Sequence, residues 1–367
     1  MASEESLIIV GASARAAAFS ALRAGLRPCC FDLFADADLR ARCHVEAIPA
    51  REYPRSLPGQ VAGAPPGPWL YTGGPENHPE IVARIARDRP LLGNDAEVLR
   101  LVRDPVFVSN LLRSAGLPYA EVSLREPDDG RAWLAKPCAS AGGTGIRVWR
   151  PGERLPRCAY FQELIAGPSC AAIFRATPAG AQLLGVTEQL VGEPWMHARR
   201  FRYCGSIGPL ALTDRQREIF QLLGDALKEG CRLQGLFGVD CVWRDDEPVS
   251  VEVNPRYTAS IEVLEYATNT PFLAGVALGK ARRVVGKAIL FARQALRFPN
   301  EGPWLETLRQ PPSITEMPAF ADIPAGGATI KSGWPILTFF SQGESIDEVR
   351  GRLQALAAEL ERWLYRQ

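Results

Sequence analysis

The segment covering residues 249–256 carries polar side chains at every second position: Glu252, Asn254 and Arg256. On an extended strand such positions share one face, with Cα atoms roughly 6.6–7 Å apart. A carboxylate and an amide oxygen at that spacing can bind one small cation, and the guanidinium that follows can neutralise a developing negative charge. The same alternation is typical of an ordinary antiparallel strand with one polar face, so the segment alone leaves both interpretations open.

The residues just before this segment predict a partner strand. Asp245 and Asp246 form a turn signal, and the hairpin that it implies brings Asp240 beside Glu252 and Asn254. Oxygen ligands of this kind suit Mg²⁺, which keeps several waters and takes further ligands from substrate phosphates; Mn²⁺ is an alternative. Two facing acids would be costly on a merely structural face.

A second candidate site lies in residues 134–149, where Lys136 precedes Gly142, Gly143 and Gly145. Glycines allow backbone N–H groups to approach phosphate oxygens closely, and a lysine on the preceding strand adds a positive charge. The loop joins two predicted strands, so it differs from a phosphate loop that opens a helix. An ordinary glycine-rich hairpin carrying a lysine is the structural alternative.

A third candidate is the strand end at Gln162, Glu163 and Leu164. Its backbone edge could pair with an adenine while the acidic side chain reaches ribose hydroxyls or the exocyclic amine. The same residues could equally form an edge strand that finishes in a polar turn.

The N-terminal region predicts a β-α-β unit and therefore a parallel sheet, with strands ending at Val10 and Asp32 around an alanine-rich helix. Gly11 and Asp32 match part of a dinucleotide-binding pattern, whose second and third glycines are missing. An NAD-type oxidoreductase is therefore a hypothesis, and a parallel α/β domain without a dinucleotide is its alternative.

Composition favours a globular protein that acts on small molecules. The 367 residues are 47% hydrophobic, and 42 basic residues nearly balance 41 acidic ones, so nothing indicates a nucleic-acid-binding surface. Nine cysteines without a Cys-x-x-Cys pair predict reduced, mostly buried thiols in a cytoplasmic protein. No apolar run is long enough to span a membrane.

Apolar spacing predicts the remaining elements. Residues 95–117 form one helix, residues 271–298 form a further helical region, and an amphipathic helix closes the chain. Short strands between about 132 and 191 predict an antiparallel sheet.

In order and spacing, these motifs resemble the ATP-grasp superfamily from about residue 7 to about 275: "IIVGAS", "AKP" before "SAGGTG", "FQELIAG", "GVDCVW" and "EVNPR". The resemblance implies an α/β and α+β fold with two antiparallel-sheet lobes gripping ATP. It implies a Rossmann-like domain over residues 1–95, a small central lobe over 96–160, a large lobe with a metal site over 161–300, and C-terminal strands and a helix over 301–367.

The resemblance also implies roles for individual residues. Lys136 would hold the nucleotide phosphates under a lid formed by Gly142, Gly143 and Gly145, and Gln162, Glu163 and Leu164 would form the adenine hinge. Asp240, Glu252 and Asn254 would bind Mg²⁺, while Arg256 would stabilise a phosphorylated carboxylate. Many members carry another phosphate-binding lysine where this chain has Pro105, which leaves Arg103 as the candidate replacement.

The implied activity is an ADP-forming carboxylate-amine ligase with small-molecule substrates, with a homodimer as the candidate assembly. "RFRYCGSIGPL" and the C-terminal segment look like a branch of predicted carboligases related to biotin carboxylase and similar to tyramine-glutamate ligases of one-carbon cofactor synthesis. A nucleotide-binding regulator without turnover is the alternative. The substrate pocket would draw on Arg202, Tyr203, Thr258 and Glu262, unless these are ordinary surface and packing positions.

Overall fold

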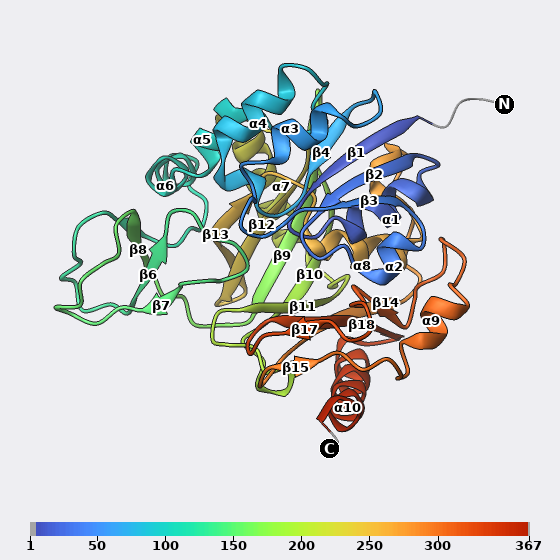
Figure 1. Cartoon of the computed structure of the whole chain (residues 1–367). Coiled ribbons are helices and arrows are strands. Elements are labelled where there is room, and N and C mark those ends of the chain that lie inside the picture. Colours follow the sequence, from blue (N-terminus) through green and yellow to red (C-terminus); the bar gives the residue numbers. More distant parts are fainter. Residues whose placement is uncertain (1–4, 366–367) are drawn as a thin grey trace.

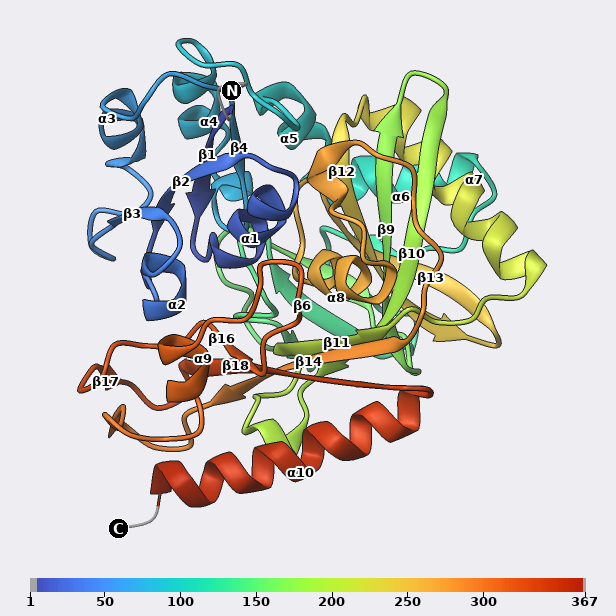
Figure 2. The same cartoon turned by 90° about the vertical axis from the view of Figure 1, so that its right-hand side faces the viewer.

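The computed structural model describes residues 5–365, which form three main sheets (Figures 1 and 2). The N-terminal sheet is parallel, with strand order β3-β2-β1-β4. Its strands are β1 (Ser6–Gly11), β2 (Arg27–Asp32), β3 (His44–Ala47) and β4 (Trp69–Tyr71). Its helices are α1 (Arg15–Arg23), α2 (Ala37–Arg40), α3 (Leu57–Ala62), the 3-10 turn η1 (Pro75–Asn77) and α4 (Pro79–Ala86).

Gly11 and Asp32, which match part of a dinucleotide-binding pattern, both make structural contacts in this part of the protein. A Cβ atom at Gly11 would lie 1.9 Å from the Thr72 hydroxyl oxygen, so only glycine permits this close approach. The Asp32 carboxylate accepts backbone N–H bonds from Ala14, Phe34 and Ala35 at 2.5–2.7 Å. Neither residue is therefore left to bind a nicotinamide nucleotide.

The helix predicted over residues 95–117 is two helices, α5 (Ala96–Val102) and α6 (Pro105–Ser114). The carboxylate of Asp104 caps α6 by accepting N–H bonds from Val106 and Phe107 at 2.9 and 3.1 Å. Proline suits the first position of a helix and disfavours helical conformation in the preceding residue, so the chain breaks here.

A small antiparallel sheet follows, with strand order β5-β8-β6-β7. Its strands are β5 (Val122–Ser123), β6 (Trp133–Pro137), β7 (Arg147–Val148) and β8 (Ala159–Glu163). In Figure 1 this sheet projects on one side of the molecule, away from the large sheet that forms the centre.

The large sheet has eight strands in the order β13-β12-β9-β10-β11-β14-β18-β16. They are β9 (Ser169–Thr177), β10 (Gly180–Val191), β11 (Tyr203–Gly208), β12 (Gly235–Arg244), β13 (Glu247–Asn254), β14 (Val284–Phe291), β16 (Phe320–Ala321) and β18 (Pro335–Gly343). A two-stranded sheet pairs β15 (Leu296–Arg297) with β17 (Thr329–Ile330).

The helical elements of this half are η2 (Pro194–Met196), α7 (Asp214–Cys231), α8 (Ala259–Thr268), η3 (Phe272–Ala274), α9 (Leu305–Arg309) and α10 (Ile346–Tyr365). Helix α7 packs on β9 and β10 and buries Phe220, Leu223 and Leu227. The nine cysteines are free thiols, six of them buried, whereas Cys158 is exposed. No helix among residues 5–365 is long and apolar enough to cross a bilayer.

The helical region predicted over residues 271–298 is wrong, because it contains η3 and the central strand β14. Strand β14 pairs with β11 on one side and β18 on the other. Its apolar run therefore reflects a strand buried on both sides, which apolar content alone does not distinguish from a buried helix.

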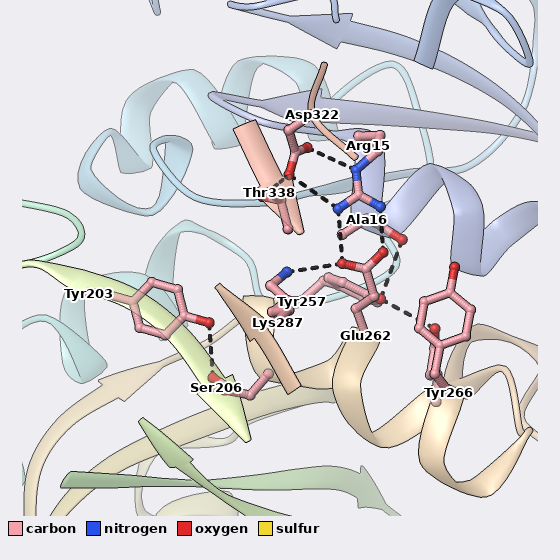
Figure 3. Close-up of polar contacts among 12 residues, drawn as sticks. Arg15, Ala16, Tyr203, Ser206, Tyr257, Glu262, Tyr266, Lys287, Asp322 and Thr338 are labelled. Carbon is pink, nitrogen blue, oxygen red and sulfur yellow. Dashed lines mark hydrogen bonds and ion pairs between the residues drawn. The ribbon is translucent and has the colours of Figure 1, made fainter. Parts of the chain in front are cut away.

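A buried ionic network joins the N-terminal sheet to α8 and the C-terminal strands (Figure 3). Arg15 of α1 forms a forked interaction with Glu262 of α8, in which its Nη2 donates to Oε2 at 2.9 Å. Arg15 Nε also donates to Asp322 Oδ1 at 2.8 Å, and Lys287 Nζ of β14 donates to Glu262 Oε2 at 2.9 Å. Burial disfavours the Glu262 carboxylate, but Arg15 and Lys287 outweigh burial and lower its pKa well below the usual range.

Replacing Glu262 with glutamine should destabilise the protein strongly, because Arg15 and Lys287 would then be buried without their shared counterion. We expect Glu262→Gln to lower the free energy of unfolding by about 3 kcal/mol or more. Urea denaturation at pH 7 measures this, with the exposed Glu359→Gln as the matched control. Equal stabilities of the two variants would contradict the importance of the network.

Candidate functional site

The β12–β13 hairpin brings the three predicted metal ligands together. Its turn residues Asp245 and Asp246 have φ values of 50° and 64°, and Asp240 lies directly opposite Glu252. Asn254 Nδ2 donates to Asp240 Oδ2 at 3.0 Å, and Gln189 Nε2 of β10 donates to Asp240 Oδ1 at 2.9 Å. The alternating pattern thus forms one polar face, as the sequence indicates.

The two facing carboxylates have opposite electrostatic surroundings. Burial and the nearby Glu252 carboxylate raise the pKa of Asp240 to about 7. Burial also disfavours ionisation of Glu252, but the positive charges of Lys136 and Arg103 outweigh burial and lower its pKa. The pair therefore binds a proton more readily at Asp240 than at Glu252 when no cation lies between them.

The donor set fits a hard divalent cation such as Mg²⁺. It consists of two carboxylates and one amide, which leaves coordination positions for waters and phosphate oxygens. No cluster of three or more His, Cys, Asp or Glu side chains suited to a metal occurs among residues 5–365, so these residues show no closed zinc-type site. Burial and then the facing Glu252 carboxylate raise the pKa of Asp240, and a bound cation would favour the ionised form of both acids.

Lys136 of β6 reaches the same face from the small sheet. Its side chain is 5% exposed, and Nζ donates to Gln162 Oε1 at 2.9 Å and to the Val251 carbonyl at 3.4 Å. Gln162 Nε2 donates to the same carbonyl at 2.9 Å. The small sheet is therefore joined to β13 at Val251, the residue before Glu252.

The glycine loop lies against the large sheet. Gly142, Gly143 and Gly145 have φ values of 58°, 78° and 79°, a region that favours glycine. A Cβ atom at Gly143 would lie 1.8 Å from the Phe201 carbonyl oxygen, so the loop backbone touches the residues before β11. Gly142 and Gly143 line the cavity described below, whereas Gly145 packs near Pro137.

The predicted hinge residues are partly engaged within the protein. The Leu164 N–H donates to the Ala132 carbonyl at 2.8 Å, and the Glu163 carboxylate accepts from Arg244 Nη1 at 3.1 Å. Gln162 is held by Lys136 and β13, as described above. A purine edge would therefore have to use carbonyl groups or the amides that follow Leu164.

Two arginines of the site are held by η1 of the N-terminal domain. Arg256 Nε donates to Glu76 Oε1 at 2.7 Å, and Glu76 is only 1% exposed. Arg103 Nη2 donates to Asn77 Oδ1 at 2.8 Å, while its Nη1 donates to Glu252 Oε1 at 3.0 Å. Sequence reasoning missed Glu76 and Asn77, since the surrounding prolines and glycines indicated only a loop.

A cavity of about 440 Å³ brings the predicted residues together. It is lined by residues of all the predicted groups except Arg103 and Gly145: Lys136, Gly142, Gly143, Gln162, Glu163, Leu164, Asp240, Glu252, Asn254 and Arg256. Arg103 instead lines a smaller adjoining cavity that also contacts Lys136, Gln162 and Glu252.

Two of the four residues named for the substrate pocket, Tyr203 and Thr258, line the large cavity. Tyr203 donates to, or accepts from, the Ser206 hydroxyl at 2.9 Å (Figure 3). Glu262 does not contribute, because it is fully buried in the Arg15 network. Arg202 lies beside the glycine loop, where its Nη1 contacts the Thr144 hydroxyl.

Comparison with known proteins identifies the class. Residues 104–260 match the family described as ATP-grasp domain. This match shows that residues 104–260 form a domain of the ATP-grasp superfamily, and the parallel N-terminal sheet and the antiparallel lobes give the chain the ATP-grasp fold. Proteins of this superfamily use ATP and Mg²⁺.

Particular relatives are distant. An uncharacterised protein of Methanocaldococcus jannaschii is 29% identical over 168 residues, which span 44% of this chain and only 39% of that relative. An L-amino acid ligase from Bacillus licheniformis has a similar structure, with a TM-score of 0.70 at 16% identity and 97% coverage of both chains.

The biotin carboxylase domain of a 2-oxoglutarate carboxylase from Hydrogenobacter thermophilus is also similar in fold. Its structure, in complex with MgADP and bicarbonate, gives a TM-score of 0.68 at 15% identity and covers 96% of this chain and 89% of that one. At these identities the two solved structures establish the fold alone.

Removing the Asp240 carboxyl should stabilise the ligand-free protein in a pH-dependent way. In the unfolded chain this group ionises near pH 4, but in the folded protein it keeps its proton to about pH 7. The wild type therefore loses stability relative to Asp240→Asn as the pH rises from about 4 to about 7, and the difference is constant above that. Urea denaturation at pH 4.5 and 8, without nucleotide or Mg²⁺, measures the change.

The exposed Asp88→Asn is the control for this experiment, because Asp88 is solvated in both states. Its difference from the wild type should be the same at both pH values. A pH-independent difference for Asp240→Asn as well would show that the two carboxylates do not interact as described.

Proposed function

We propose that the protein is an ATP- and Mg²⁺-dependent ligase that activates a carboxylate and joins it to an amine. The carboxylate oxygen attacks the terminal phosphorus of ATP, giving an acyl phosphate and ADP. The amine then attacks the acyl carbon, forming the amide and releasing phosphate. The main support for this proposal is that residues distant in sequence line one cavity. They are Lys136, Gly142 and Gly143 of the glycine loop, the carboxylates of Asp240 and Glu252, and Arg256.

Each residue of the proposed site is assigned a role according to its charge and hydrogen-bonding groups. Lys136 and Arg103 would neutralise the nucleotide phosphates, and Gly142, Gly143 and Gly145 would allow backbone N–H groups to approach these phosphates. Asp240, Glu252 and Asn254 would hold Mg²⁺, which supplies charge neutralisation for the transferred phosphoryl group. Gln162, Glu163 and Leu164 form the wall on which the purine would rest.

Arg256 is proposed to bind the acid substrate and its phosphorylated form. Its guanidinium is oriented by Glu76 and by Asn254 Oδ1, which accepts from Nη2 at 3.1 Å. A planar, always charged group suits a carboxylate or an acyl phosphate. Tyr203 and Thr258 provide hydroxyl groups in the same cavity for the remainder of the substrates.

The substrates themselves are proposed as a small acid and a small amine. Amino acids are proposed on account of the similar fold of an L-amino acid ligase. Glutamate joined to an amine in one-carbon cofactor biosynthesis is the finer proposal, and it rests on the resemblance of "RFRYCGSIGPL" and the C-terminal segment to tyramine-glutamate ligases. We also propose that the protein forms a homodimer and that it is located in the cytoplasm.

The first test is ADP formation from Mg²⁺-ATP with pooled amino acids and other carboxylates and pooled amines including tyramine. We expect one acid–amine pair to stimulate ADP release, and Glu252→Gln to reduce that release by a factor of about 100 or more, since it removes a metal ligand. The matched control is Glu247→Gln, which changes a glutamate of the same strand paired only with exposed Arg215.

Binding of ATP without ADP formation for any pair would favour a nucleotide-binding regulator instead. Equal activity of the two variants would show that Glu252 is not part of the catalytic site.

Glu76→Gln should separate catalysis from nucleotide binding. The change removes the counterion that orients Arg256, while Arg103 and Lys136 are untouched. We expect ADP formation to fall about tenfold or more at saturating ATP, with an unchanged rise in melting temperature on adding Mg²⁺-ATP. A parallel loss of ATP-induced stabilisation would instead indicate that η1 supports the nucleotide site as a whole.

A further inference from the structure

Three pairs of cysteines lie close together among residues 5–365. Two of these pairs each contain at least one fully buried thiol: Cys30 with Cys43, and Cys170 with Cys241. The third pair, Cys138 and Cys158, lies at the end of the β6–β8 ladder in the small sheet, which projects from the molecule in Figure 1. Cys158 is exposed and Cys138 is partly buried. A dissolved oxidant therefore reaches the third pair most directly.

Cys138 and Cys158 continue the pairing of β6 with β8. The last pair in the register is Pro137 with Ala159, and beyond it the Cys138 N–H donates to the Cys158 carbonyl at 2.9 Å. Residues that face each other in a hydrogen-bonded antiparallel pair have Cα atoms roughly 5.5 Å apart. Disulfide bonds span Cα separations of about 4.4–6.8 Å. The backbone pairing therefore places the two cysteines at a separation that suits a disulfide.

The two thiols have different surroundings. Cys158 has a φ of 56°, so the chain leaves the strand at this residue and exposes its side chain. Burial raises the pKa of Cys138, and the nearby Cys158 acts in the same direction while Arg103 opposes it. Redox-sensitive sites combine an accessible cysteine with a neighbouring cysteine that reacts with its oxidised form. Cys158 suits the first role and Cys138 the second.

The pair encloses the glycine loop. The segment between the two cysteines, residues 139–157, contains that loop and β7. At its start, Arg103 Nη2 donates to the carbonyls of Cys138 and Ser140 at 3.2 and 3.3 Å. Further along, Gly143 lies against the large sheet beside the cavity. A covalent bond between the two ends of this segment would limit how far the loop can move away from the cavity.

We propose that Cys138 and Cys158 form a reversible disulfide that restrains the glycine loop. A peroxide oxidises the Cys158 thiol to a sulfenic acid and is reduced to water. The Cys138 thiolate then attacks the sulfenic sulfur, which forms the S–S bond and releases the second oxygen as water. Two thiols thus lose two electrons and two protons to one peroxide, and a dithiol reductant reverses the reaction.

The first experiment treats the full chain with a small molar excess of hydrogen peroxide and maps disulfides by mass spectrometry of unreduced peptides. We expect one peptide pair linked through Cys138 and Cys158, with a loss of two hydrogen atoms that dithiothreitol restores. Cys158→Ser should abolish the link. The matched control, Cys43→Ser, removes another partly buried cysteine and should leave the link unchanged. A disulfide between the Cys158 residues of two chains, or a sulfinic acid at Cys158 without a link, would overturn the inference.

The second experiment measures amide hydrogen exchange in residues 139–157 for the reduced and the oxidised wild type. Because the bond closes this segment, we expect oxidation to slow its exchange about threefold or more in the wild type and to leave Cys158→Ser unchanged. Equal exchange in the two states of the wild type would show that the bond does not restrain the loop.

These two readouts need no nucleotide, so they are independent of the proposed function. The consequence for catalysis rests on that function: oxidised wild type should bind Mg²⁺-ATP about threefold or more slowly than reduced wild type in stopped-flow tryptophan fluorescence. An unchanged binding rate in the linked protein would overturn this consequence. A reduced wild type that binds no ATP would overturn the proposed function, whereas the disulfide and the exchange data would still decide the inference.

Discussion

The site is organised around one unfavourable arrangement, the partly buried carboxylates of Asp240 and Glu252 directly opposite each other on neighbouring strands. Like charges in this position destabilise a sheet unless nearby groups compensate. Arg103 and Lys136 supply positive charge on the Glu252 side, and the amides of Gln189 and Asn254 hold Asp240. A divalent cation would replace part of this compensation, so the same carboxylates and amides are suited to bind a metal.

The compensating groups belong to the small and large sheets or follow α5. Lys136 belongs to the small sheet, Gln189 to the large sheet, and the arginines are oriented by η1 beside the parallel sheet. The Arg15–Glu262–Lys287 network holds α8, whose N-terminal residues line the cavity, against the N-terminal domain. The N-terminal domain therefore contributes to the geometry of the site although none of its residues was predicted to.

One sequence prediction is wrong, and two alternatives that the sequence left open are decided by tertiary contacts. Residues 271–298 were predicted helical because a doubly buried strand and a buried helix have similar apolar content, and only the pairing of β14 with β11 and β18 separates them. Glu262 was a candidate for the substrate pocket, but its carboxylate forms a buried ion pair with Arg15, 247 residues away in the sequence. Gly11 and Asp32 matched part of a dinucleotide pattern, yet a close contact with Thr72 and three backbone N–H groups account for both.

Local spacing by itself determined the hairpin with Asp240, Glu252 and Asn254 on one face, because strand periodicity and turn chemistry act within some twenty residues. It also determined the parallel β-α-β unit at the N-terminus and, through the order of its motifs, the ATP-grasp domain that residues 104–260 match. Only the tertiary structure decided which charges meet. Glu76 and Arg256 are 180 residues apart, and Thr144 and Arg202 are 58 apart. Such pairs carry no periodic signal, since their contact depends on how three separately formed sheets pack together.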